Sequence, residues 1–98
     1  MIYIVFYDIT SNKIRNKLAK LLIAEGFERL QFSVYTGLTD ILEDKKIKEV
    51  ITQLLAPEPE AKFYVLPVLK KNFKKMKNIG IFDIDLEYLT GDKRSLTC

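Results

Sequence analysis

The chain has 98 residues, of which 48% are hydrophobic and 30% charged, the composition of one globular domain rather than a disordered tail or a membrane segment. It contains no histidine, which excludes histidine catalysis and histidine-ligated zinc, so any metal must be held by oxygen ligands. The net charge of +3 permits a nucleic-acid partner without establishing one.

Two features bear on the cellular compartment. The chain begins directly with a strand-like segment instead of a secretory signal, and it has no apolar run long enough to cross a bilayer. Its single cysteine, Cys98, has no partner for an internal disulfide, which agrees with a reducing compartment. We therefore expect a cytoplasmic protein without membrane contact.

The first eight residues form an apolar run that ends in a carboxylate. The run is short and rich in β-branched and aromatic side chains, which predicts a strand. Alternation places the even-numbered residues, including Asp8, on one face and the odd-numbered residues on the other. Both faces are apolar, so the strand should lie inside a sheet that is covered on both sides. Asp8 precedes the polar turn at 10–12, where it could take part in chemistry or, alternatively, accept hydrogen bonds from the turn's amides.

An amphipathic helix is predicted after this turn. One of residues 10–12 can cap its start, and Gly26 can end it in a left-handed conformation. Basic side chains, among them Arg15 and Lys17, occupy the surface outside its apolar stripe. A phosphate backbone that approached Asp8 would meet these cations; the alternative is a solvated helix face.

Residues 28–36 alternate between apolar and polar side chains, which predicts one further strand. Phe32 belongs to the set that should face the core. Arg29, Ser33 and Tyr35 belong to the polar set and could bind phosphates or ribose. The alternative is an exposed sheet face that carries polar residues for solubility.

The second half of the chain predicts a helix, an edge strand and a basic segment. The helix should end at residue 55 before two prolines, with Thr39 or Asp40 as its cap. The following strand, 61–69, contains Pro67 and should therefore lie at a sheet edge or carry an irregularity at that residue. The lysine-rich run 70–77 could bind phosphates or form a solvated connector.

Strands over 79–84 and 86–90 and a polar tail over 91–98 complete the predicted elements. The order of elements fits strand, helix, strand, strand, helix, strand, with a short extra C-terminal strand. This is the order of an α+β, ferredoxin-like βαββαβ sandwich with both helices on one face of an antiparallel sheet. We expect a single domain over 1–98, and a homodimer in which a second copy covers the open sheet face.

Several of these features resemble a known family. The strand that ends in Tyr7-Asp8-Ile9, the basic helix behind it, and the motif Arg29-x-Gln31-x-Ser33-Val34-Tyr35-x-Gly37 are similar to the small CRISPR-associated adaptation protein, often called the CRISPR-associated endoribonuclease. The resemblance covers nearly the whole chain. It implies a ferredoxin-like homodimer that acts in antiviral defence and in maintenance of CRISPR repeat arrays, with a large integrase as partner during spacer insertion.

The resemblance also implies a magnesium-dependent nuclease that hydrolyses phosphodiester bonds in single-stranded RNA and, in some members, double-stranded DNA. The family's metal-binding, catalytic aspartate corresponds to Asp8. Because Mg²⁺ prefers six oxygen ligands, two copies of Asp8 across a two-fold axis would have to hold the ion. The candidate substrate-binding residues are Arg15, Lys17, Arg29, Ser33 and Tyr35.

The alternative function is a non-catalytic dimeric scaffold that binds duplex DNA and the CRISPR integrase. The nuclease hypothesis predicts that Asp8→Ala abolishes cleavage while the dimer and its nucleic-acid affinity survive. The scaffold hypothesis predicts that the same change leaves spacer acquisition intact.

Overall fold

The structure, a computed structural model, describes residues 1–77. Its strands are β1 (Ile2–Asp8), β2 (Glu28–Gln31), β3 (Val34–Gly37) and β4 (Lys62–Val68). Its helices are α1 (Asn12–Ala24), the 3-10 turn η1 (Ile41–Glu43), α2 (Lys45–Leu55) and α3 (Lys70–Phe73). The expected strands 79–84 and 86–90 and the tail 91–98 lie outside the described residues.

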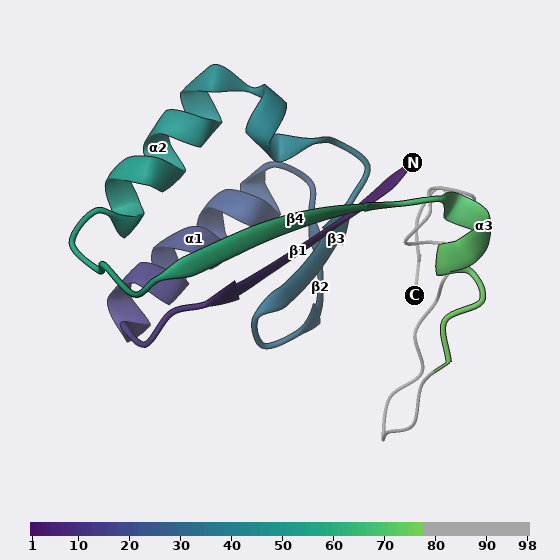
Figure 1. Ribbon diagram of the computed structural model, residues 1–98, viewed down its shortest axis with the longest axis horizontal. Helices are drawn as coiled ribbons and strands as arrows, with labels where there is room; N and C mark the ends of the chain where they lie inside the picture. Colours follow the sequence, from purple (N-terminus) through teal and green to yellow (C-terminus); the bar gives the residue numbers. More distant parts are fainter. Residues whose placement is uncertain (78–98) are drawn as a thin grey trace.

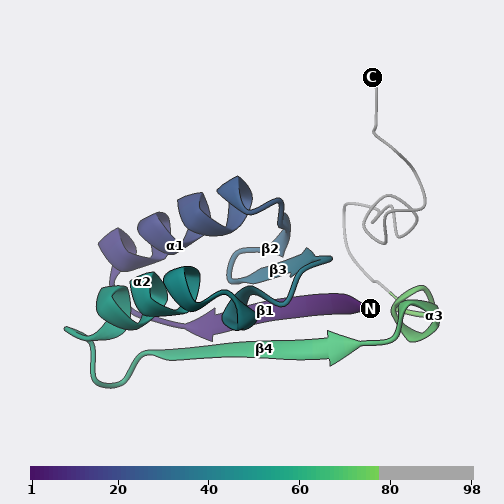
Figure 2. The ribbon, with the colours of Figure 1, turned by 90° about the horizontal axis from the view of Figure 1, so that it is seen from above.

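The strands form one antiparallel sheet in the order β2-β3-β1-β4, and α1 and α2 lie side by side on one of its faces (Figures 1 and 2). This is the expected ferredoxin-like α+β arrangement, although its two strands between the helices both come from residues 28–37, where the sequence predicted one strand. The apolar β1 lies inside the sheet. Within residues 1–77, β4 is an edge strand, one of the two positions expected from Pro67, which has no amide hydrogen to donate to a neighbouring strand.

The predicted ends of α1 are confirmed. The amide of Ile14 donates a 3.3 Å hydrogen bond to the Ser11 side-chain oxygen, so Ser11 is the N-terminal cap. Gly26 follows the last turn with φ of +89°, a conformation that L-amino acids with a side chain rarely adopt. The start of α1 is therefore fixed directly behind the carboxyl end of β1.

The start of α2 differs from the prediction. Asp40 caps the 3-10 turn η1, since its carboxylate accepts a 3.2 Å hydrogen bond from the amide of Leu42. Asp44 caps α2 itself and accepts hydrogen bonds of 3.0 and 3.3 Å from the amides of Lys46 and Ile47. The expectation that Thr39 or Asp40 caps this helix is therefore wrong, because the chain makes one extra turn before α2 begins.

The segment 28–36 also differs from the prediction. It is not one strand but a tight hairpin, in which β2 and β3 pair and the turn lies at residues 32 and 33. The pairing shifts by one residue between Arg29 and Gln31. As a result Tyr35, expected on a polar face, is fully buried, whereas Phe32, expected in the core, has 71% of its surface exposed.

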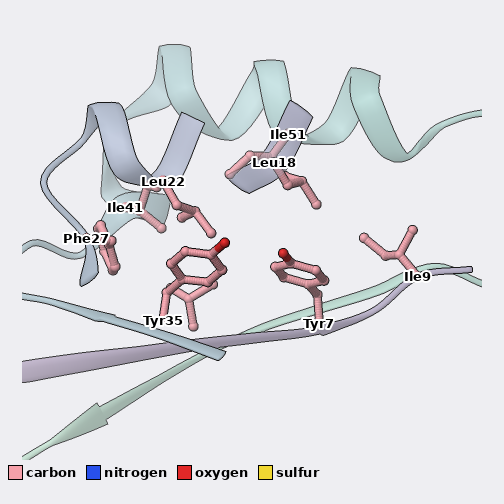
Figure 3. Packing of buried hydrophobic residues seen from close by; sticks show 9 residues of the cluster. Tyr7, Ile9, Leu18, Leu22, Phe27, Tyr35, Ile41 and Ile51 are labelled. Carbon is pink, nitrogen blue, oxygen red and sulfur yellow. The ribbon is translucent and has the colours of Figure 1, made fainter. Parts of the chain in front are cut away.

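The core lies between the sheet and the two long helices. Tyr7 from β1 and Tyr35 from β3 rise from the sheet toward Leu18 and Leu22 of α1, with Ile51 of α2 beside them (Figure 3). Full burial of an aliphatic or aromatic side chain of this size contributes roughly 1.5–3 kcal/mol. This packing holds the carboxyl end of β1 and the start of α1 in one rigid unit.

The opposite face of the sheet carries exposed apolar side chains. Phe6 of β1 and Tyr64 of β4 stack with ring centroids 4.8 Å apart, and they retain 36% and 44% exposure. Leu66, the next residue on the same face of β4, is 49% exposed. None of the helices within residues 1–77 is long and apolar enough to cross a membrane.

Candidate nucleic-acid site at the carboxyl end of β1

Asp8 is the last residue of β1 and is exposed, opposite Lys62 on β4. Its carboxylate accepts no hydrogen bond from any residue in the described part of the chain. Ser11 caps the helix that follows, so the structural role considered for Asp8 belongs to Ser11 instead. The oxygens of Asp8 are therefore available to accept hydrogen bonds from a ligand or to bind a cation.

An open pocket of about 290 Å³ lies beside Asp8. Its remaining lining comes from Thr10 and from residues 58–61, the loop between α2 and β4. Within residues 1–77, no three acidic, cysteine or histidine side chains come close enough together to hold a metal ion. The described part of one chain thus offers Asp8 with open access from solvent but no complete cage for a cation.

The turn of the β2–β3 hairpin lies against the end of β1. The amide of Tyr7 donates a 3.2 Å hydrogen bond to the carbonyl oxygen of Ser33, and Val34 pairs with Phe6. Ser33, which is half-buried, is therefore bonded to the residue that precedes Asp8. The hairpin brings the motif around Ser33 to the same end of the sheet as the carboxylate.

Arg29 is anchored by the tyrosine that lies opposite it in the hairpin. Its Nε donates a 2.9 Å hydrogen bond to the Tyr35 hydroxyl, and its guanidinium carbon lies 5.3 Å from the centroid of the Tyr35 ring. Tyr35 is fully buried, so its hydroxyl contacts the exposed Arg29 and not the solvent. Tyr35 is thus placed to orient Arg29 rather than to touch a ligand.

Tyr7 is buried next to Tyr35, and its hydroxyl points toward that of Tyr35 (Figure 3). Burial, together with the neighbouring Tyr35 hydroxyl, raises the pKa of Tyr7 from 10.0 to about 12, although Arg29 and Arg15 act in the opposite direction. Tyr7 therefore stays protonated at neutral pH and does not serve as a base.

Arg15 approaches the same hairpin from α1. Its guanidinium donates a hydrogen bond to the Asn12 side-chain oxygen and lies 5.7 Å from the centroid of the Phe32 ring. The guanidinium of Arg29 lies 5.6 Å from the same centroid. Within residues 1–77, neither arginine forms an ion pair with a carboxylate. Two cations thus meet at the turn, and neither is neutralised by a carboxylate of the described residues.

The structure gathers most of the candidate residues predicted from the sequence. Arg29, Ser33 and Tyr35 lie on one hairpin beside the end of β1, and Arg15 reaches it from α1. Lys17 does not join them, because residues two apart on a helix point in different directions, and it stands exposed on α1. Phe32 was missed, because its place in the alternation assigned it to the core.

Comparisons with known proteins point to one family. A family model described as CRISPR associated protein Cas2 matches residues 1–76. CRISPR-associated endoribonuclease Cas2 2 from Pyrobaculum aerophilum is 44% identical over 52 residues, which are 47% of this chain and 57% of the relative, so the match spans little more than half of that protein.

A solved structure shows the same fold. The Streptococcus pyogenes Cas2 crystal structure at pH 6.5 superposes with a TM-score of 0.66 at 22% identity, covering 82% of this chain and 100% of the other. At this identity the likeness establishes the ferredoxin-like fold alone. The family model, in contrast, extends over every strand and helix described above. The chain therefore belongs to the CRISPR associated protein Cas2 family.

Proposed function

We propose that the chain is a CRISPR-associated endonuclease that uses Asp8 and Mg²⁺ to hydrolyse phosphodiester bonds, with single-stranded RNA as its first substrate and double-stranded DNA as a second. The observation that carries this proposal is the exposed Asp8 carboxylate, which has no hydrogen-bond partner within residues 1–77. The name of the Pyrobaculum relative, an endoribonuclease, supports RNA as the substrate.

We propose that the chain forms a homodimer through the open face of the sheet. Phe6, Tyr64 and Leu66 leave an apolar surface exposed, and a second copy of the chain would remove it from water at roughly 25 cal/mol per Å². Asp8 stands on the same face of β1 as Phe6, because the two are two positions apart along a strand. Packing through this face therefore brings both Asp8 side chains into the layer between the subunits.

Asp8 suits Mg²⁺, which takes carboxylate and water oxygens. One carboxylate is not sufficient, and residues 1–77 contain no group of three metal-binding side chains. We propose that the second carboxylate is the partner subunit's Asp8. Mg²⁺ bound there would polarise a phosphoryl oxygen and lower the pKa of a bound water molecule. The metal would thus take the place of a histidine base, since this chain contains no histidine.

The remaining residues bind and position the substrate. Arg15 and Arg29 neutralise phosphates of the bound strand at the turn of the hairpin, and the hydroxyl of Ser33 orients the strand between that turn and Asp8. Tyr35 acts through Arg29, whose orientation its hydroxyl fixes. Lys17 adds affinity that depends on salt and not on sequence, since it stands apart from the hairpin.

The test is cleavage of labelled single-stranded RNA and duplex DNA by the purified protein and by Asp8→Asn, each with Mg²⁺ and with chelator. Asp8→Asn keeps the shape of the side chain and removes its charge. We expect cleavage to require both the metal and Asp8, while sedimentation and RNA affinity without metal stay unchanged. Lys13→Gln, which alters a charge on the exposed side of α1, is the matched control and should retain cleavage.

Equal cleavage by both proteins would identify a contaminating nuclease and refute the proposal. Spacer acquisition in cells then distinguishes the other role. If Asp8→Asn supports acquisition together with the CRISPR integrase while neither protein cleaves RNA or DNA, the chain acts as a dimeric scaffold for duplex DNA and the integrase.

A further inference from the structure

We propose that Phe32 is a stacking platform for one unpaired nucleobase, with Arg15 and Arg29 holding the phosphates that flank it. This inference rests on the proposed function for the class of ligand, and it adds a residue that determines substrate specificity. It concerns the recognition of a single strand and does not depend on cleavage.

The first observation is the exposure of the ring. Phe32 stands at the turn between β2 and β3 with 71% of its surface in contact with solvent, the largest exposed fraction among the exposed large hydrophobic side chains of residues 1–77. A tight turn does not call for an aromatic residue, since turns favour small and polar side chains. Turn formation therefore does not explain why an aromatic ring stands here.

The second observation is the pair of guanidinium groups beside the ring. Arg15 and Arg29 lie 5.7 and 5.6 Å from its centroid, within the range of a cation–π contact. Each is held by a second side chain, Arg15 by Asn12 and Arg29 by Tyr35. Because both are anchored and neither has an anionic partner within residues 1–77, they form a preorganised receptor for anions.

The third observation is the place of this cluster in the molecule. Phe32 precedes Ser33, whose carbonyl oxygen accepts a hydrogen bond from the amide of Tyr7. The platform therefore lies beside the end of β1, where Asp8 stands. Arg15 contacts the ring from α1, which covers the helix side of the sheet. The ring is thus separate from the open face that carries Phe6, where the second copy is proposed to bind.

Charge favours nucleic acid over protein as the ligand. A second copy would bring the same two arginines against each other, whereas a polynucleotide supplies both a flat ring and flanking negative charges. A base in a duplex is stacked on both sides and cannot reach the ring, so the platform selects unpaired nucleotides. Stacking on an aromatic side chain accepts any base, and we therefore expect selection by strandedness and not by sequence.

The chain contains no tryptophan, so Phe32→Trp introduces a single fluorescent reporter at the platform. The experiment uses the full chain with chelator, a short single-stranded RNA, the same strand with abasic residues, and a duplex DNA. We expect the normal RNA to quench the tryptophan fluorescence, and the abasic strand of equal charge and the duplex to leave it nearly unchanged.

Affinity gives a second readout. Loss of one stacked base costs about 1–3 kcal/mol, so Phe32→Ala should raise the Kd for single-stranded RNA by about 5- to 150-fold and leave the Kd for duplex DNA within about twofold. Ile23→Ala, which removes another exposed apolar side chain from α1, is the matched control and should change neither. Arg15→Gln and Arg29→Gln should each lower the salt dependence of RNA binding.

Three results would overturn the inference: equal quenching by the normal and abasic strands, an unchanged Kd for single-stranded RNA in Phe32→Ala, or a dimer that dissociates in Phe32→Ala. The last would mean that a second copy covers the ring. Base-dependent quenching by a protein that cleaves nothing would support the platform and refute the nuclease. Cleavage that needs Asp8, without base-dependent quenching, would support the nuclease and refute the platform.

Discussion

The contact between Tyr35 and Arg29 links the buried core to the proposed RNA site, and Tyr35→Phe tests it by removing one oxygen atom. The ring remains and stays buried, so the packing of the core is preserved. Arg29 loses the acceptor that lies 2.9 Å from its Nε, and Tyr7 loses its hydroxyl neighbour. The change therefore isolates the hydrogen bond from the aromatic contact.

The size of the effect follows from the burial of this bond. Hydrogen bonds to charged groups contribute about 1.5–3 kcal/mol, and the exposed position of Arg29 places this one at the lower end. We expect Tyr35→Phe to lower the free energy of unfolding by about 1–2 kcal/mol. Once its orientation is no longer fixed, Arg29 should bind phosphate less well, with a rise in the Kd for single-stranded RNA of about 3- to 10-fold.

A double-mutant cycle provides the assay, with urea unfolding and RNA affinity measured for Tyr35→Phe, Arg29→Gln and the double variant. If Tyr35 acts through Arg29, Tyr35→Phe should change RNA affinity in the native background and leave it unchanged in Arg29→Gln. Tyr3→Phe, the same chemical change at another tyrosine of the sheet, is the control. An equal loss of RNA affinity in both backgrounds would mean that Tyr35 does not act through Arg29.

Three further predictions follow from the fold. Leu66→Lys on the open sheet face should dissociate the dimer in sedimentation experiments, whereas Val50→Lys on α2, which is also exposed, should not; a monomeric Val50→Lys would contradict the proposed interface. Tyr7 ionises at about pH 10 when unfolded and at about pH 12 when folded, so the free energy of unfolding should be insensitive to this group below pH 10 and fall between these values. Tyr7→Phe should flatten that fall, and an identical alkaline profile would contradict the raised pKa. Gly37→Ala would place a new carbon 2.7 Å from the Phe27 ring and should cost about 1–3 kcal/mol in urea unfolding; an unchanged midpoint would mean that this contact is loose.

Much of the fold could be predicted because its signals are local. The apolar run of β1, the cap at Ser11 and the glycine after α1 act within a few residues of the feature that they determine. Pro67 placed β4 at an edge for an equally local reason, the missing amide hydrogen. Asp8 stood out because a carboxylate ends an otherwise apolar strand.

The hairpin was missed because its signal is not local. Phe32 and Ser33 lack the glycine, asparagine or proline that usually marks a two-residue turn, and alternation continues through them. The antiparallel pairing of β2 with β3 shows that the chain reverses there. The alternation therefore predicted neither the exposure of Phe32 nor the burial of Tyr35.

The start of α2 was misplaced for a related reason. Asp40 and Asp44 are both good caps, and each precedes residues that can continue a helix. The structure uses both, the first for a 3-10 turn and the second for α2. Composition does not distinguish the two positions, and Ile41, which follows the first cap, is buried in the core.

The proposed active site contains two Asp8 carboxylates, one from each subunit. Its test is the activity of mixtures of the native protein and Asp8→Asn after subunit exchange. If both carboxylates are needed, only native dimers cleave RNA, and an equal mixture should retain about one quarter of the activity of the same total amount of native protein. Retention of about one half would show that each Asp8 works alone and would contradict the shared site.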